Sequence, residues 1–165
     1  NTYTITVSNN VFNVNQAHLG GAMAMYQNVM NPGTRKPLVV NNTFVQNHAV
    51  ATGGAIRLTG DEGSGIVTFN NIFWENTADI EGVDIFNYSS TGYTYVHNSD
   101  INQDLISGLW MGAMNFHEDP LFLDTLFHIG GPSCQNSGIS YLDIGGTGNR
   151  YDAPCLDMDL HPGLQ

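Results

Sequence analysis

The sequence predicts an all-β protein, a right-handed parallel β-helix (β-solenoid) with 28–32 residues per coil and an irregular C-terminal cap. Three observations lead to this prediction. A pattern, N-N-x-F-x-x-N-x-A, recurs along the chain. A short run of β-branched and aromatic residues precedes each copy. Only 12% of the residues are charged and 19 are glycine, which leaves little material for amphipathic helices, while the 41% hydrophobic content argues against disorder.

The repeat is regular in content and in spacing. Its complete copies begin at Asn9, Asn41 and Asn70, and a weaker copy begins at Asn98. The apolar anchors of the four copies are Phe12, Phe44, Phe73 and Ile101. Successive anchors are 32, 29 and 28 residues apart. A period near 28 with short β runs is typical of a parallel β-helix in which each repeat forms one coil, and connections between parallel strands are right-handed.

Each repeat predicts three short strands. The first enters the copy, at residues 5–8, 37–40, 66–69 and 94–97. After the Asn pair comes a bend, and then a second short strand that carries the Phe anchor. A glycine follows 8 or 9 residues after that anchor and opens a third strand, such as residues 55–58. Stacked coils about 4.8 Å apart would then build three parallel sheets.

The repeated side chains have structural explanations. The Phe column should point inward and stack as an aromatic ladder. The Asn column should lie at a bend, with amides bonded to the coils above and below. Gly20, Gly53 and Gly82 should supply a bend that a β-carbon would hinder. The ladder residues are Phe12, Phe44 and Phe73, and Asn15, Asn47 and Asn76.

The alternating F-x-x-N and G-G-A-I segments resemble the repeats of the chlamydial-type polymorphic outer-membrane proteins and of bacterial surface β-helix proteins. The resemblance covers residues 1 to about 104, and Val83 departs from it where a second Gly is expected. Residues 118–138 and 157–162 are similar to the closing region of secreted bacterial β-helix proteins. The resemblance implies an extracellular or bacterial cell-surface location. We assign residues 1–117 to about four coils and residues 118–165 to a closing segment that caps the stack.

The sequence predicts a further structural feature at each end of the chain. Cys134 and Cys155 fit a single disulfide in a secreted protein, and the alternative is two small buried hydrophobic side chains. The chain opens in a strand-like run, residues 3–7, with no charged-then-apolar leader, as in a mature piece or fragment. That first strand has an unpaired edge. We therefore expect other protein segments or chains as partners at the N-terminal coil.

Charge excludes several classes of partner. The 4 Lys and Arg against 15 Asp and Glu give a net charge of −11. Phosphate binding needs clustered cations, so a nucleic-acid partner is not expected. No apolar run approaches the roughly 20 residues of a spanning helix, so membrane insertion is not expected either. Glycans stay open as partners.

Three residues are candidates for glycan contact. Arg57 should alternate outward on its strand, and Asp84 of the next coil should lie diagonal to it. This pair is either a carbohydrate subsite or a surface ion pair. Trp74 should point outward if Phe73 points inward, and it is either a sugar platform or an aromatic residue covered by the loop 105–117.

The sequence assigns no catalytic residue and no cofactor. The histidines show no metal-ligand spacing, and there is no G-x-S-x-G, P-loop or C-x-x-C motif. We expect the acids Asp79, Glu81, Asp84, Asp100 and Asp104 to form a solvated face; the alternatives are the carboxyl pair of a hydrolase and, between the two, weak Ca²⁺ binding. We expect a structural or adhesive module of a secreted or cell-surface bacterial protein. The alternative is a carbohydrate-active β-helix enzyme, lyase-like or hydrolase-like, or a glycan-binding module.

Overall fold

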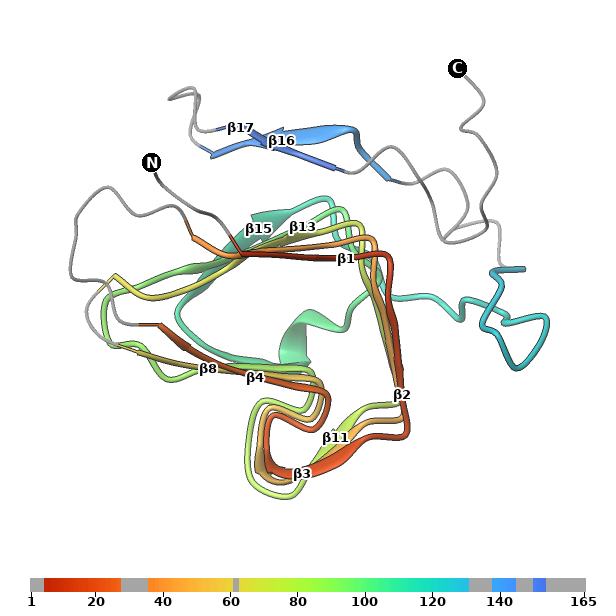
Figure 1. The fold of residues 1–165 in the computed structure, drawn as a ribbon, viewed down its shortest axis with the longest axis horizontal. Coiled ribbons are helices and arrows are strands. Elements are labelled where there is room, and N and C mark those ends of the chain that lie inside the picture. The colour runs from red at the N-terminus through yellow and green to blue at the C-terminus, as the bar shows by residue number, and fades with distance from the viewer. Residues whose placement is uncertain (1–4, 28–35, 61–62, 131–137, 145–149, 154–165) are drawn as a thin grey trace.

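The computed structural model describes residues 5–27, 36–60, 63–130, 138–144 and 150–153. Successive coils stack on one another and overlay closely when viewed along the stack (Figure 1). The chain turns clockwise as it recedes from the viewer, so the solenoid is right-handed. The predicted fold class, an all-β parallel β-solenoid, is confirmed.

The strands of successive coils form four parallel sheets, named A to D. Sheet A contains β1 (Thr6–Ser8), β5 (Leu38–Val40), β9 (Val67–Phe69), β13 (Thr94–His97) and β15 (Trp110–Ala113). Sheet B contains β2 (Val11–Asn13), β6 (Thr43–Val45) and β10 (Ile72–Trp74). Sheet C contains β3 (Gln16–Leu19), β7 (His48–Thr52) and β11 (Thr77–Ala78). Sheet D contains β4 (Met23–Gln27), β8 (Ile56–Gly60), β12 (Ile85–Asn87) and β14 (Ile106–Gly108).

The expectation of three strands per coil is corrected by sheet C. The sequence predicts no strand between the ladder Asn and the glycine turn, yet these residues pair in register, His48 with Thr77 and Ala49 with Ala78. The Ala side chains allow this because Ala49 is fully buried where the chain crowds between two bends. A full coil therefore has four strands.

The fourth coil is shorter than the others. Thr94 of β13 pairs with Trp110 of β15, only 16 residues later, and sheet C has no fourth strand among the described residues. A 3-10 helix, η1 (Gln103–Leu105), leads directly into β14 instead. The segment 105–117, expected to be a loop, thus contributes β14 and β15 to the stack.

The shortening explains the departure from the repeat at Val83. Gly53 adopts φ 73°, and a β-carbon at Gly54 would lie 2.1 Å from the Val83 carbonyl oxygen in the coil below. Stacked turns at these positions therefore require glycine. Val83 is tolerated because the fourth coil enters β14 from η1 and has no equivalent turn beneath it.

The bore of the solenoid is filled by the repeated anchors. The rings of Phe12 and Phe44 stack with centroids 4.8 Å apart, and those of Phe44 and Phe73 stack 4.9 Å apart. Ile101 continues this column at 1% exposure. The aliphatic residues of sheets A and D complete the same core.

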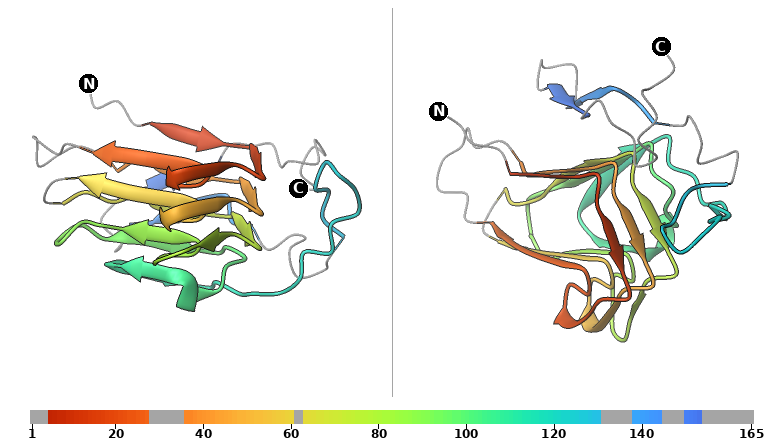
Figure 2. Two further views of the ribbon diagram at one scale, coloured as in Figure 1. Left: turned by 90° about the horizontal axis from the view of Figure 1, so that it is seen from below. Right: turned by 45° about the vertical axis from the view of Figure 1, so that its right-hand side comes forward.

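The described C-terminal residues cover a side of the solenoid. The hairpin of β16 (Tyr141–Asp143) and β17 (Arg150–Asp152) lies along the outer side of sheet A (Figures 1 and 2). Its Tyr151 and Leu142 pack with Leu38, Val40 and Phe69. We expected this segment to close the end of the stack. The lateral position follows from continuous apolar runs such as Leu38–Val40, which present hydrophobic side chains on both sides of sheet A.

Candidate functional site

The predicted Asn column forms a hydrogen-bonded ladder. The Asn47 Oδ1 accepts from the backbone N–H of Asn15 at 3.1 Å and from its Nδ2 at 2.9 Å. The Asn76 Oδ1 accepts the same two bonds from Asn47, at 3.0 and 2.9 Å. Asn47 Nδ2 also donates to the Phe12 carbonyl at 2.9 Å, so every polar atom of this fully buried side chain is paired.

A second ladder runs through the other bend, and the sequence reasoning missed it. Each rung donates its backbone N–H to the side-chain oxygen of the next coil, as Asn42 does to Asn71 at 2.9 Å. The rungs are Asn10, Asn42, Asn71, Ser99 and Asn115. The second Asn of each repeated pair marks this ladder in the sequence.

The residue before each rung explains why Asn occurs in pairs. Asn9, Asn41 and Asn70 have φ of 57°, 55° and 56°. Asn tolerates this left-handed conformation better than other non-glycine residues. Each bend thus uses one residue to turn the chain and the next to bond the coils together.

In both ladders the N–H groups donate toward the later coil, so no earlier rung donates to the side-chain oxygen of the first Asn. Every N–H and Nδ2 group that joins two rungs points toward the later coil. Among the described residues, the side-chain oxygens of Asn10 and Asn15 consequently accept no hydrogen bond, and both residues are exposed. Phe12, which is fully covered on its later side by Phe44, is only partly buried.

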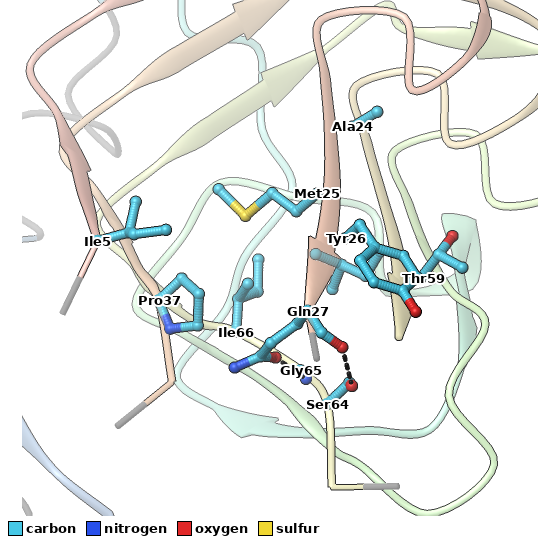
Figure 3. Close-up of a pocket in the computed structure, with 11 residues that line it drawn as sticks. Ile5, Ala24, Met25, Tyr26, Gln27, Pro37, Thr59, Ser64, Gly65 and Ile66 are labelled. Carbon is cyan, nitrogen blue, oxygen red and sulfur yellow. Dashed lines mark hydrogen bonds between the residues drawn. The ribbon is translucent and has the colours of Figure 1, made fainter. Parts of the chain in front are cut away.

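A cavity of about 280 Å³ lies between sheets A and D near this first coil (Figure 3). Its apolar lining comes from Ile5 and Pro37 on the sheet A side, from Met25 and Leu58 on the sheet D side, and from Ile66. Gln27 closes one edge, because its carbonyl accepts from Ser64 Oγ at 3.0 Å and its Oε1 accepts from Gly65 N–H at 2.8 Å. The first coil thus exposes apolar core as well as ladder acceptors.

Asp84 lies inside the solenoid and not on its surface. The carboxylate is 2% exposed, and its Oδ1 accepts from Asn76 Nδ2 at 2.9 Å. Burial raises the pKa of Asp84 to about 7, the Asn76 hydrogen bond lowers it, and the nearby Asp100 raises it further. Asp84 therefore terminates the Asn47–Asn76 ladder. The expected pair with Arg57 does not form, because Asp84 points into the core while Arg57 points outward.

Arg57 lies instead against aromatic rings on the outside of sheet D. Its partner in register is Phe86, and its Cζ is 5.8 Å from the Phe86 centroid and 5.9 Å from that of Tyr88. Its Nε is buried and donates no hydrogen bond. The sequence placed Arg57 outward correctly, but the aromatic neighbours depend on the register of adjacent coils.

Trp74 is partly buried and in contact with the segment that the sequence proposed as its cover. Its ring lies 5.2 Å from that of His117. The Nδ1 of His117 is 3.9 Å from Oδ1 of Asp100, a residue only 1% exposed. Asp100 Oδ1 also accepts from the Glu118 N–H at 3.1 Å. Trp74 and Arg57 lie on different sheets and do not form one site.

The remaining candidates give no metal or membrane site in the described part of the chain. Cys134 and Cys155 lie outside the described residues. Among the residues that are described, no three His, Cys, Asp or Glu side chains gather closely enough to hold a metal ion. Within the same ranges, no helix has the length and apolar character needed to cross a bilayer.

No family model, no curated protein and no solved structure matches this chain.

Proposed function

We propose that this chain is a structural, non-catalytic module of an elongated β-solenoid at the cell surface or outside the cell. The observation that carries the proposal is the open first coil, where Asn10 and Asn15 present ladder acceptors beside the Phe12 ring. A further coil with the same repeat fits this surface, because its Asn residues would donate to those oxygens as each rung does below. The resemblance to the repeats of polymorphic outer-membrane proteins supports the proposed location.

The distribution of polar groups supports a structural function. The buried Asn side chains bond the coils to one another, and the buried Asp84 is bonded to the ladder. Glycosidic cleavage by a carboxyl pair needs both groups to reach the sugar, and Asp84 is sealed in the core. Arg57 is a poor base because its guanidinium stays charged.

Adding one coil tests the stacking proposal. A copy of residues 36–65 placed directly before Ile5 keeps the register, since Thr6, Leu38 and Val67 occupy equivalent positions. We expect this extended chain to unfold at a higher urea concentration than the original, because the first coil gains ladder bonds and cover for its core. Equilibrium urea unfolding followed by circular dichroism measures the change.

Asn15→Ala is the matched control. In the original chain Asn15 is an exposed end rung, so the substitution should cost under about 1 kcal/mol. In the extended chain Asn15 becomes an interior rung, and the same substitution should cost about 1 to 3 kcal/mol. An equal cost in both chains would show that the added coil does not stack on the first.

The absence of catalysis is a separate prediction. We expect no unsaturated product and no new reducing ends when the protein is incubated with pectin, alginate or neutral glucans. Absorbance of unsaturated uronates and a reducing-sugar assay detect the two reaction types. Arg57→Ala should leave both readings at the background, whereas product formation that disappears in this variant would establish a carbohydrate-active enzyme.

A further inference from the structure

The outward side of sheet D combines aromatic rings with a cation. Register places Ala24, Arg57, Phe86 and Ser107 in one row and Tyr26 and Thr59 in the next, where Tyr88 follows β12. These residues alternate with Ile56, Leu58 and Ile85, which lie in the core. We call this surface, made of Ala24, Tyr26, Arg57, Thr59, Phe86, Tyr88 and Ser107, the sheet D outer face.

The guanidinium of Arg57 is held in place, and among the described residues its buried Nε has no acceptor. It is positioned over the rings of Phe86 and Tyr88, as a cation–π contact requires. This Nε is shielded from solvent, so a ligand would reach the partly buried Arg57 through its Nη groups. No ion pair within the described residues involves Arg57, and none of the seven residues of the face is acidic. A ligand carboxylate would satisfy this guanidinium, because a carboxylate matches its planar fork.

The two exposed tyrosines indicate the chemical class of the ligand that bears this carboxylate. Tyr26 is 70% exposed and Tyr88 is 66% exposed, and each lies one coil from Thr59, on opposite sides of it. An exposed Tyr offers a rigid apolar ring and a polar tip, which suits a ligand with apolar faces and hydroxyl edges. The row advances by one coil, about 4.8 Å, per step, which suits a repeating chain of pyranose units along the stack.

We propose that the sheet D outer face binds an acidic oligosaccharide, with a sugar carboxylate on Arg57 and sugar rings against Tyr26 and Tyr88. The binding proposed here adds a ligand to the structural module and does not depend on coil stacking.

Calorimetric titration with a tetrasaccharide of galacturonic acid tests the proposal. Physiological ionic strength is needed to screen the negative net charge of the protein. We expect binding, and we expect Arg57→Met and Tyr88→Ala each to weaken it by about tenfold or more. Met retains an apolar side chain against Phe86. Arg150→Met is the matched control, because Arg150 also covers a tyrosine, Tyr141, but bonds Asp152; it should leave the Kd unchanged.

Several outcomes would overturn the proposal. They are the absence of binding, equal binding by the Arg57→Met variant, and equal binding of a neutral galactose tetrasaccharide or of a tetraglutamate peptide. Ring-proton NMR of the unsubstituted protein guards against a variant that fails to fold. Addition of the tetragalacturonate should shift the ring signals of Tyr26 and Tyr88 and leave those of Tyr141 unmoved, and the reverse result would also refute binding at this face.

Discussion

Replacing Asn47 with Ala is expected to lower the free energy of unfolding by about 1 to 3 kcal/mol. The side chain is fully buried, donates to the Phe12 carbonyl and to Asn76 Oδ1, and accepts two bonds from Asn15. Ala removes the bonds made by the Asn47 side chain, and at the buried bend Asn76 Oδ1 keeps only the backbone N–H of residue 47 as a donor from this coil. Urea unfolding at neutral pH measures the loss.

Asn47→Asp separates hydrogen bonding from packing. Asp keeps the shape of Asn and can still accept from Asn15, but when ionised it can donate to neither the Phe12 carbonyl nor Asn76 Oδ1. It should therefore destabilise the protein at least as much as Ala. If either variant is as stable as the original chain, the hydrogen bonds of the Asn47 side chain do not stabilise the fold.

Asp84→Asn should stabilise the protein at alkaline pH and remove a pH dependence. Burial raises the pKa of Asp84 from 3.8 to about 7 in the folded protein. The unfolded chain therefore releases this proton at lower pH than the folded chain does. The protonated carboxyl favours folding fully below pH 4, and this contribution is lost as the pH rises to about 7. Above that pH the folded protein holds a buried charge.

The difference between the original chain and Asp84→Asn isolates this effect from the histidines. We expect the Asn variant to gain about 2 to 4 kcal/mol relative to the original between pH 4 and pH 8. Urea unfolding at several pH values gives the two curves. Asp104→Asn, the same change at an exposed acid of η1, should leave the curve parallel to the original. Parallel curves for Asp84→Asn as well would place Asp84 outside the core.

The repeat by itself specifies much of the fold. Its period predicts one coil per repeat, and its Phe and Asn anchors each form a column because equivalent positions in a parallel solenoid stack directly. The glycine turn at Gly53 follows from a residue type that tolerates such backbone. These features depend on local conformation and on periodicity, which a single sequence records.

Other features depend on how one coil meets the next or on distant segments. The alternation of side chains along a strand predicts that Asp84 lies diagonal to Arg57. The bend before β12 instead turns the Asp84 carboxylate into the core, where Asn76 Nδ2 donates a hydrogen bond to it. The shortened fourth coil, with β14 entered from η1, has no distinct mark in the repeat. The hairpin on sheet A depends on long-range burial of Leu38, Val40 and Phe69.

The sequence by itself therefore determined the coil, the Phe column, one of the two Asn ladders and the outward direction of Arg57. Only the tertiary structure decided which residues face Arg57, that Asp84 ends a ladder, and that the ladder acceptors of the first coil have no donor in the described part of the chain. The physical reason is that a repeat specifies how each coil bonds to its equivalent, whereas electrostatics and burial depend on neighbours that break the repeat.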